Sequence, residues 1–383
     1  MGRQADRGHR VTRARILHLA YEDPRADGSG GGSVRTIEIN ERLAEHYDIT
    51  AVSVPFRGAR PRTERGVRYE HLGLAHGGKF TRQLAYFAKL PLYVRRYAAD
   101  YDLVIEDFGA PFGSVGVPRY TSKPVVGVIQ WLFAAEKARQ YHLPFTIVED
   151  FGLRSHTRLI TVSQGMAADI GDRHPSARVD VIANGLPDEV LTCTRLPGAR
   201  RHVLYLGRLD IAHKGLDLLL TAFASARHYM DQNLDIAGDG DGAAWLHAEI
   251  TRQGLTDRVN LIGRIAEGDR FAALARYDVV AMPSRYESFG MVAAEAAAVG
   301  TPVVAFDIDC LRELVPPSLR VPAFDADAFA EKLVEVCSDG DFRTRLGREL
   351  PESVRHLSWD VLADQQAAVY DDVLAGLSLR NSR

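Results

Sequence analysis

Two glutamates stand eight positions apart in the segment SRYESFGMVAAEAAAVGTPVVA, residues 284–305. Glu287 precedes a run of small residues that is typical of a helix, and Glu295 falls inside that run. We expect the helix to begin near Phe289 or Gly290, so that its first amides have no partner within it. Such amides favour anionic groups, and carboxylates accept hydrogen bonds from vicinal hydroxyls. The pattern suits a ligand that carries phosphate and sugar. An acid near a helix start also stabilises the helix, which explains Glu287 alone.

Two basic residues mark another loop, in the segment LYLGRLDIAHKGL. Arg208 follows a strand-like run, and Lys214 with Gly215 precedes an apolar pattern typical of a helix. Because a helix N-terminus disfavours cations, we expect both side chains to bind a negatively charged group. An arginine fork and a lysine point charge suit a diphosphate, and they would stabilise charge on a departing phosphate. Two solvated cations, or a local Arg208–Asp210 pair, is the alternative.

A glycine-rich loop, GSGGGS at Gly28–Ser33, follows the first strand-like run and precedes a helix expected from about Val34. Glycines let a backbone approach a ligand closely, and free amides at a helix start favour an anion. We predict ligand contact here. The alternative is a flexible linker.

A second glycine pattern, Gly238-x-Gly240 after a strand-like run, nearly matches the dinucleotide-binding fingerprint. That fingerprint expects an acid at the end of the next strand, but this strand ends in Gly263-Arg264. An NADP-dependent oxidoreductase that uses Arg264 for the extra phosphate is therefore an alternative function. It would leave Arg208 and both glutamates without a purpose.

Three Asp-x-Asp pairs have the spacing of a metal-binding pair. In a chain with 50 acidic residues we attribute them to chance. We predict a site without metal, because Arg208 and Lys214 already supply the charge of a divalent ion. The pairs are Asp239-x-Asp241, Asp307-x-Asp309 and Asp325-x-Asp327.

Short apolar runs alternate with longer helical segments along the chain, which predicts parallel sheets with helices on both faces. The strand-like runs are RILHLA, ITAVSVP, YDLVIEDF, PVVGVIQW and TRLITVS, then RHVLYLGRL, LDIAG, RVNLIG, YDVVAMPS and TPVVAFD. Helices are expected over 34–47, 80–98, 215–230, 243–253, 268–275 and 290–299, and in the last segment, SWDVLADQQAAVYDDVLAG.

These elements predict an α/β fold of two doubly wound, Rossmann-like domains that face a central cleft. The first domain is expected over 1–185, a linker over 186–201, the second domain over 202–360, and a final helical segment over 361–383. Ligands of such folds bind beyond the carboxyl ends of the strands, which is where the loops above lie.

The composition limits the function classes. With 383 residues, 46% hydrophobic and 25% charged, the chain is long enough for two ordinary globular domains. A net charge of -3 gives no general attraction to nucleic acid. Three cysteines without paired spacing exclude a disulfide framework and a cysteine zinc site. The arginine-rich start lacks the apolar stretch of a signal peptide, so we expect a cytoplasmic protein.

Residues 79–97 combine basic side chains with five aromatic ones. Such a segment can rest on an anionic membrane, so we consider peripheral membrane contact through 79–97. The alternative is a helix that packs its aromatic side chains into the first domain. Pro91 interrupts the pattern.

The motif ESFGMVAAE resembles the acid–seven residues–acid motif of retaining nucleotide-sugar glycosyltransferases of family 4, which have the GT-B fold. GRLDIAHKG is similar to the Gly-Arg…Lys-Gly segment of the same family, and AGDGDGAA, LIGRI and VIANGLPDEV match its other landmarks. The final segment is similar to the family's C-terminal helix, which returns to the first domain. The resemblance covers nearly the full length and is stronger in the second half.

The resemblance implies a role for each motif. Arg208 and Lys214 would bind the donor diphosphate and stabilise it as it leaves. Glu287 would hold hydroxyls of the transferred sugar, and Glu295 would hold the ribose diol. The other implied donor contacts are Gly31, Gly32, Gly207, Gly238, Gly240, Arg264, Ile265, Ser288, Phe289, Gly290, Met291 and Val292.

One position departs from the family pattern. The family usually carries a histidine at the end of the strand that matches PVVGVIQW, and here Gln130 stands there, followed by Trp131. Gln130 can still bond a sugar hydroxyl and is counted among the donor contacts. The identity of the donor sugar is left open.

The resemblance implies a soluble, retaining glycosyltransferase that needs no cofactor. It would move a sugar from a nucleoside diphosphate, most often UDP in this family, to a hydroxyl of a small molecule, natural product or glycan. Front-face attack, with the departing diphosphate taking the proton, is the implied mechanism. A non-catalytic sugar-nucleotide-binding protein is a further alternative.

Overall fold

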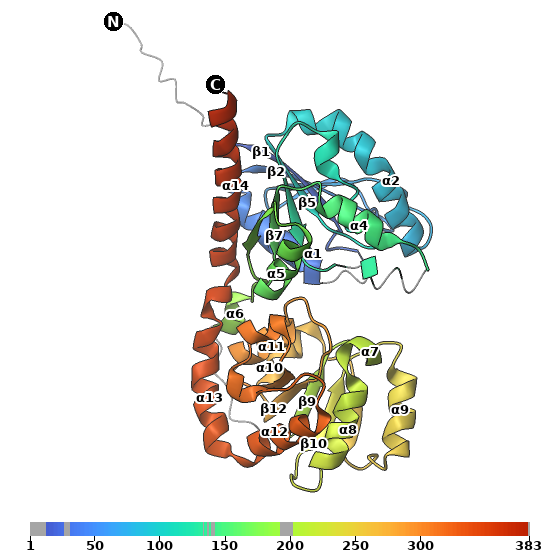
Figure 1. Ribbon diagram of the computed structural model, residues 1–383, viewed down its shortest axis with the longest axis vertical. Coiled ribbons are helices and arrows are strands. Elements are labelled where there is room, and N and C mark those ends of the chain that lie inside the picture. The colour runs from blue at the N-terminus through green and yellow to red at the C-terminus, as the bar shows by residue number, and fades with distance from the viewer. Residues whose placement is uncertain are drawn as a thin grey trace, which may run out of the picture. The chain divides into compact units, whose positions relative to one another are not determined.

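The computed structural model describes residues 13–26, 31–132, 134–135, 138, 142–191 and 202–381. These residues form two compact units, each with its own sheet and helices (Figure 1). The first unit contains the chain up to Thr161, then Asp169–Ile182 and the residues from Ala363 on. The second contains Val162–Ala168 and Ala183–Leu362.

The first unit is built on an eight-stranded sheet in the order β3-β4-β2-β1-β5-β6-β7-β8. Every described pairing is parallel except that of β3 with β4. The strands are β1 (Arg15–Tyr21), β2 (Asp48–Ser53), β3 (Arg62–Glu64), β4 (Val67–His71), β5 (Leu103–Asp107), β6 (Val125–Ile129), β7 (Arg158–Thr161) and β8 (Arg178–Val181). Its helices with described bounds are α1 (Gly31–Leu43), α2 (Lys79–Tyr97) and α4 (Phe145–Leu153), with the short turns η1 (Ala98–Asp100) and η2 (Val117–Tyr120). Helix α5 (Gln164–Arg173) begins in the second unit and continues in the first from Asp169.

Helix α2 covers part of this sheet with one face. Its side chains Tyr86, Phe87, Leu90 and Val94 are buried in a cluster with residues of β1, β2 and β5. The helix is continuous through Pro91, so the predicted interruption there was wrong. A proline removes one backbone hydrogen bond, and the burial of four large side chains on one face offsets that loss.

The second unit is built on a six-stranded, parallel sheet in the order β11-β10-β9-β12-β13-β14. Its strands are β9 (His202–Leu206), β10 (Asn233–Ala237), β11 (Val259–Gly263), β12 (Val279–Met282), β13 (Val303–Phe306) and β14 (Arg320–Val321). Its helices are α6 (Asp188–Leu191), α7 (Ile211–Lys214), α8 (Leu216–Ala226), α9 (Ala243–Arg252), α10 (Arg270–Leu274), α11 (Met291–Ala298), α12 (Ala326–Ser338) and α13 (Gly340–Ser353). The remaining short turns are η3 (Glu267–Asp269), η4 (Asp309–Glu313), η5 (Pro317–Leu319) and η6 (Arg355–Leu357).

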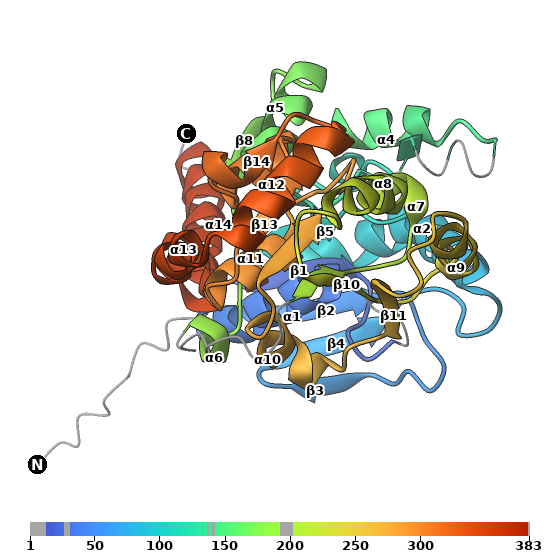
Figure 2. The same ribbon diagram turned by 90° about the horizontal axis from the view of Figure 1, so that it is seen from below.

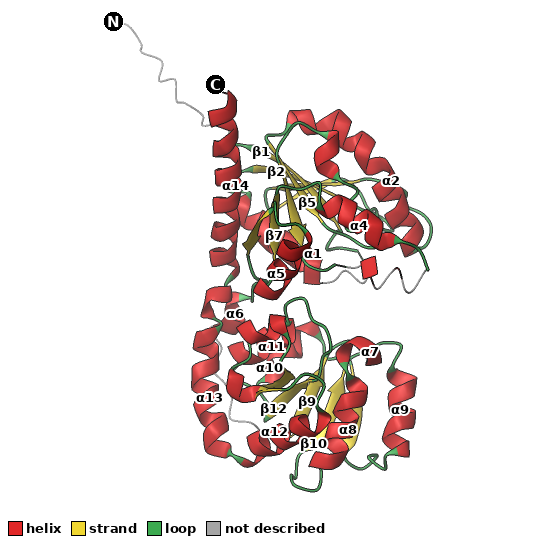
Figure 3. Cartoon of the chain, viewed as in Figure 1, coloured by secondary structure: helices red, strands yellow, loops and turns green. Residues whose placement is uncertain are grey.

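Helices flank both sheets, as Figure 3 shows by colour. Helices α8 and α12 pack against each other (Figure 2). Because helices cover the sheet, β9 and β12 read as continuous apolar runs and are buried along nearly their whole length. The parallel α/β architecture predicted from the alternating pattern is confirmed.

The last helix, α14 (Trp359–Asn381), begins in the second unit and continues in the first. Tyr47 donates a hydrogen bond of 2.6 Å to Asp371, and Arg158 pairs with Asp372 at 2.8 Å. Near its start, Trp359 packs against Gly185. Of the predicted linker 186–201, residues 192–201 lie outside the described residues, and α6 belongs to the second unit.

The contact of Gly185 with Trp359 leads to a prediction about the free energy of unfolding. A Cβ atom at Gly185 would lie 2.4 Å from Trp359 Cδ2. We expect Gly185→Ala to lower the free energy of unfolding by about 1–3 kcal/mol, because buried positions tolerate extra volume poorly.

Gly171→Ala in α5 is the matched control. A Cβ atom at Gly171 would have no neighbour within 4 Å, and helical alanine is favoured over glycine by about 0.5–1 kcal/mol. Urea unfolding curves of both variants would measure the contrast. Equal stability of the two variants would contradict this packing.

Candidate active site

Glu287 and Lys214 meet at the carboxyl end of the second sheet. Lys214 Nζ lies 2.5 Å from Glu287 Oε1, and Ser284 donates a hydrogen bond of 2.8 Å to the same oxygen. The Lys214 and Glu287 side chains are only 16% and 9% exposed, so the pair is largely shielded from water. Two residues that were predicted to bind one ligand, 73 positions apart, are therefore in contact.

Lys214 is positioned by a one-turn helix rather than by the start of a long one. Asp210 caps α7 by accepting from the His213 amide at 3.0 Å, and Lys214 ends it. Gly215 then adopts φ +65°, and a Cβ atom there would lie 2.0 Å from the Pro283 carbonyl oxygen. Only glycine fits this position.

Two expectations about this loop were wrong. Lys214 stands in the last turn of α7, where the helix dipole favours a cation, so its placement needs no anion to explain it. The Asp210 side chain contacts His213, at 3.0 and 2.8 Å, and makes no ion pair with Arg208. The helix predicted over 215–230 is α8, Leu216–Ala226, which begins one residue after the left-handed Gly215 and is preceded by the unpredicted α7.

Arg285 fastens the Glu287 loop to the Lys214 loop. Its amide donates to the His213 carbonyl at 2.9 Å, and its guanidinium forms two hydrogen bonds, of 2.8 and 2.6 Å, with Asp217. It also donates to the Ile211 carbonyl at 3.2 Å. Sequence reasoning missed Arg285 and Asp217, because their 68-residue separation leaves no local pattern.

Arg208 follows β9 and has an exposed side chain. Among the residues that the structure describes, no carboxylate forms an ion pair with it. Its carbonyl accepts a 2.8 Å hydrogen bond from Tyr205. Burial raises the pKa of Tyr205 most, the charges of Glu287 and Asp210 raise it further, and Arg208 opposes them. The charges of Arg208 and Glu287 thus act in opposite directions on the pKa of the same group, the Tyr205 hydroxyl. Because no described carboxylate pairs with it, the Arg208 guanidinium can bind an anion.

The loop that nearly matches the dinucleotide fingerprint packs so closely on the loop after β9 that Gly238 and Gly240 leave no room for a side chain. Gly238 has φ +148°, and a Cβ atom there would lie 1.8 Å from the Gly207 carbonyl oxygen. A Cβ atom at Gly240 would lie 2.8 Å from the Leu209 carbonyl oxygen. The Leu209 amide in turn donates to the Asp239 carbonyl at 2.9 Å. Close contact of two backbone loops explains this pattern without a dinucleotide.

Helix α11 begins at Met291, just after the predicted start. Gly290 precedes it with φ +97°, and a Cβ atom there would lie 2.5 Å from Leu311 Cδ2. The first helical hydrogen bond runs from the Ala293 amide to the Gly290 carbonyl, at 2.9 Å. The amides of Met291 and Val292 precede it. Ser288, Met291 and Val292 are half-buried and Phe289 is buried.

Glu295 lies inside α11 and is 7% exposed. Arg270 of α10 donates to its Oε2 at 2.7 Å through Nε and lies 2.6 Å away through Nη2. Burial raises the pKa of Glu295, and Arg270 opposes that rise. Sequence reasoning missed Arg270. Beyond β11, Arg264 is exposed and Ile265 is half-buried.

In the first unit, Gln130 reaches the start of α1. Its Nε2 donates to the Gly32 carbonyl at 3.2 Å. Gly31 is the first residue of α1, and the predicted ligand contact of Gly28–Gly30 falls outside the described residues. The structure thus brings Gln130 and Gly32 together.

A buried polar network underlies this helix start. Thr36 donates to Asp107 Oδ2 at 2.8 Å, and Asp107 Oδ1 lies 3.0 Å from His18 Nε2. His18 Nδ1 lies 2.9 Å from Asn40 Oδ1. Burial alone lowers the pKa of His18, but Asp107 raises it above its ordinary value. This network, which sequence reasoning missed, holds α1 to β1 and β5.

The Asp-x-Asp pairs have local partners. Asp239 accepts from the Gly240 amide, Asp307 pairs with Arg312 and Arg320, and Asp325 caps α12. Among the described residues, no three His, Cys, Asp or Glu side chains form a group that could hold a metal ion.

Two family models match most of the chain. The model described as Glycosyltransferase Family 4 matches residues 29–190, and the model described as Glycosyl transferases group 1 matches 194–352. The chain belongs to glycosyltransferase family 4. Neither family description nor the relatives below point to an oxidoreductase.

Curated relatives of this glycosyltransferase family are similar over part of their length. A phosphatidyl-myo-inositol mannosyltransferase of Mycobacterium leprae is 34% identical over 203 residues, 50% of this chain and 53% of that protein. A glycogen synthase of Mycobacterium tuberculosis is 30% identical over 247 residues, 61% and 57% of the two chains. The chain thus spans about half the length of the curated relatives it matches.

Solved structures confirm the GT-B fold of this family member. A sucrose-phosphate synthase from Thermosynechococcus elongatus superposes with a TM-score of 0.78, at 23% identity, over 95% of this chain and 100% of that one. Alr3699/HepE from Anabaena, solved with UDP and glucose, gives 0.69 at 20% identity over 94% and 100%.

The Lys214–Glu287 contact leads to a prediction about the free energy of unfolding that does not depend on the protein's activity. We expect Lys214→Met to lower the free energy of unfolding by about 1–3 kcal/mol, because a largely buried carboxylate loses its cation. Adding Glu287→Gln to that variant should restore at least half of the loss. Urea unfolding of both single variants and the double variant measures the coupling. Additive losses would show that the two side chains do not interact.

Proposed function

We propose that this chain transfers a sugar from a nucleoside diphosphate, UDP first, to a hydroxyl of an acceptor, with retention of anomeric configuration and without a metal ion. The observation that carries the proposal is the contact of Lys214 with Glu287 beside the first amides of α11. A cation, an acid and free helix amides in one place match a phosphate joined to a hydroxyl-bearing ring.

Each side chain has a part in the proposed reaction. Arg208, exposed and without a carboxylate partner among the described residues, takes one phosphate, and the Lys214 ammonium takes charge that forms on the departing oxygen. Among the described residues, both hydrogen bonds to the Glu287 carboxylate end on Oε1, so Oε2 is left to accept from a sugar hydroxyl. Glu295 keeps Oε1 for the ribose, because Arg270 bonds Oε2.

The bond changes balance without a protein nucleophile. The acceptor oxygen forms a bond to the anomeric carbon on the face from which the diphosphate oxygen departs. The carbon–oxygen bond to the diphosphate breaks, and that oxygen takes the proton of the acceptor hydroxyl. The protein then contributes orientation and charge stabilisation. UDP is proposed because it is the commonest donor type in the family, and the similar fold of Alr3699/HepE was solved with it.

We expect UDP to raise the melting temperature, since a ligand that binds only the folded state stabilises it. Arg208→Ala and Lys214→Ala should each lower the transfer rate by about 100-fold or more, because each removes charge stabilisation of the leaving group. Arg252→Ala is the matched control, an exposed arginine that pairs within α9 at Glu249. Thermal shift with UDP, ADP and GDP sugars, followed by product analysis, measures both effects.

Several outcomes of these assays would count against the proposal. Near wild-type turnover in both cationic-site variants would refute the assignment of the site. A shift with nucleotide sugars but no transfer or hydrolysis would favour the non-catalytic sugar-nucleotide-binding alternative. Inversion in the product would refute retention.

We also propose that the chain works in the cytoplasm and touches an anionic membrane through residues 79–97. None of the helices in the described parts of the chain is long and apolar enough to span a bilayer. The outer face of α2 exposes Leu84 and Leu92, at 45% and 72%, near Lys89 and Arg95. Apolar side chains among cations suit the surface of an anionic bilayer.

Vesicle flotation tests this contact. We expect the protein to float with phosphatidylglycerol vesicles at low salt and to be released as salt screens the charges. Leu92→Glu should reduce flotation several-fold, because it places an acid on the bilayer side. Equal flotation of the variant, or binding to neutral vesicles, would argue against contact through α2.

A further inference from the structure

A pocket in the first unit lies where β1 and β2 end and α2 begins. It is a small hollow that is open to solvent. None of its residues was predicted from the sequence to bind substrate. Its lining includes Tyr21, Glu22, Asp23, Phe56, Lys79 and Arg82.

The pocket contains one buried acid, Asp23, whose negative charge is already balanced by neighbouring groups. Asp23 Oδ1 accepts from the Arg25 amide at 2.9 Å and from Arg62 at 3.1 Å. Its Oδ2 accepts from Arg62 at 2.8 Å and lies 3.1 Å from His71 Nε2. Burial alone would raise the pKa of Asp23, but His71 and Arg62 bring it well below its usual range. The carboxylate is ionised and its oxygens are occupied.

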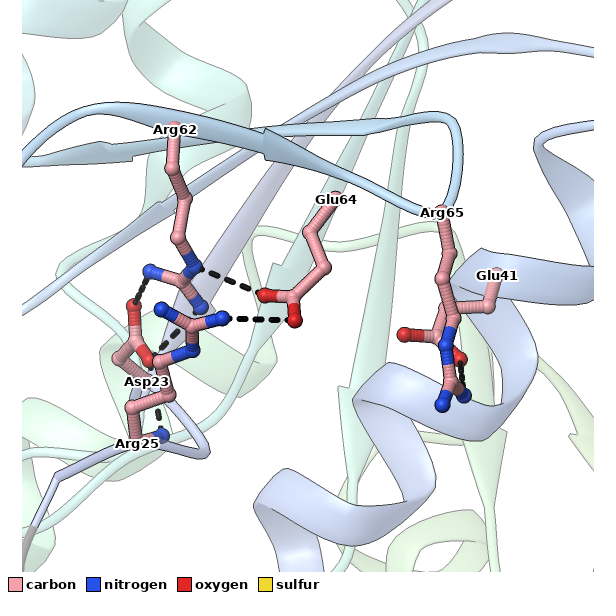
Figure 4. A network of polar contacts seen from close by, with 6 residues as sticks. All are labelled: Asp23, Arg25, Glu41, Arg62, Glu64 and Arg65. Atoms are coloured by element: carbon pink, nitrogen blue, oxygen red, sulfur yellow. Dashed lines mark hydrogen bonds and ion pairs between the residues drawn. The ribbon is translucent and has the colours of Figure 1, made fainter.

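The positive charges of Arg25 and Arg62 are balanced in turn by carboxylates. Figure 4 shows Glu64 accepting from both guanidiniums while Arg62 also bonds Asp23. Glu64 takes these bonds at 2.7 and 3.0 Å. This network therefore leaves neither of its arginines free for a ligand.

Arg82 differs from these arginines. Its Nη1 donates to the Pro55 carbonyl at 3.0 Å, and its Nε is buried without a hydrogen-bond partner. No carboxylate among the described residues forms an ion pair with it. A buried donor without a partner is unfavourable, and an anion that draws the guanidinium to itself would supply that partner.

Lys79 lies one turn before Arg82 on the same face of α2. Its side chain is 63% exposed, and its ammonium lies 3.4 Å from Glu22 Oε1, a weak contact at the surface. Both cations belong to the first turn of a 19-residue helix that has no side-chain cap. The helix start adds its own preference for an anion.

Tyr21 forms part of the pocket in a strained backbone conformation, with φ +50°. Its hydroxyl donates to the Ala110 carbonyl at 2.7 Å and accepts from Gln83, and its ring packs on Gly109. Strain of this kind persists where surrounding contacts enforce it, and it is common at ligand sites. Phe56 forms an apolar wall of the pocket, and its ring packs edge-to-face on the His71 ring with the ring centroids 5.7 Å apart.

We propose that this pocket binds the acceptor of the transfer reaction through a phosphate group, held by Arg82 and Lys79. The rest of the acceptor, a polyol or sugar, lies along Phe56. The role of the bound molecule as acceptor rests on the proposed function, whereas the phosphate site stands on the pocket itself. The phosphate can come from a soluble phosphomonoester or from the phosphodiester headgroup of a lipid.

Isothermal titration without any donor tests the soluble source. Glucose 6-phosphate and glycerol 1-phosphate are the probes, with glucose and glycerol as uncharged counterparts. We expect the phosphorylated probes to bind more tightly than their counterparts. Arg82→Gln and Lys79→Gln should each weaken binding by at least about tenfold, because each removes a charge-assisted bond. Lys89→Gln is the matched control, a cation of the same helix outside the pocket.

Vesicles of phosphatidylglycerol, compared with phosphate-free vesicles of digalactosyldiacylglycerol, test the lipid source with Arg82→Gln and Lys79→Gln. Arg252→Gln is the control in this arm, because Lys89 lies on the proposed membrane face. Loss of binding in Arg82→Gln but not in the control of the same arm, Lys89→Gln for the soluble probes and Arg252→Gln for the vesicles, supports the pocket and identifies the source. The proposal is overturned if no phosphate-bearing probe binds in either arm, or if the pocket variants bind like the wild type.

The thermal shift with nucleotide sugars separates this inference from the proposed function. Pocket variants that keep the donor shift but lose the phosphate probe support the pocket. Wild-type protein that binds the phosphate probe but no nucleotide sugar would refute the proposed function and leave the phosphate site standing.

Discussion

The close approach of Gly215 to the Pro283 carbonyl constrains the whole donor side of the second unit. Because this position admits no side chain, the start of α8 can press against the end of β12. That approach carries Lys214 to Glu287, and Arg285 then bonds back to the Lys214 loop and to Asp217. A cation and an acid from distant parts of the chain are thereby held in one geometry before any ligand arrives.

The same close packing of backbone recurs between β9 and β10. Gly238 and Gly240 let two loops touch through their backbones, and the loop that carries Arg208 is held by the bond of Leu209 to Asp239. Glycines that resemble a phosphate-binding fingerprint here serve the packing of one loop on another. A rigid frame of backbone contacts leaves the polar side chains as the variable part of the site, which fits a fold that serves many reactions.

Much of this arrangement was predictable from the sequence. Apolar runs that alternate with amphipathic segments predicted the parallel sheets, and the spacing of Glu287, Lys214 and Arg208 pointed to one ligand. The Lys214–Glu287 contact supports that grouping. The one-turn helix α7 before Gly215 was not predictable, because four residues are too few to show a helical period.

Partners that are distant in sequence escaped prediction for a physical reason. Arg270 reaches Glu295, Arg285 reaches Asp217, and Thr36 reaches Asp107 only after the sheets have formed. Four strands were not predicted: β3 and β14 have only three and two residues, and β4 and β8 carry charged residues instead of an apolar run. Local signals predict elements and candidate residues, whereas the assembled fold decides which side chains satisfy one another.

The contacts of α14 have a consequence for how the chain can be shortened. Arg35 is only 2% exposed, and its guanidinium donates to Gln366 at 2.8 Å, while Gln366 also bonds Tyr370. Removing the chain from Gln366 on would take one hydrogen-bond partner from this buried charge and would uncover the ring of Tyr47, which packs on Tyr370, a larger penalty than the loss of a surface tail. A protease that trims this end, or a fusion that pulls it away, would therefore be expected to unravel the N-terminal half of the molecule, even though the cut lies far downstream of Arg35 in the sequence.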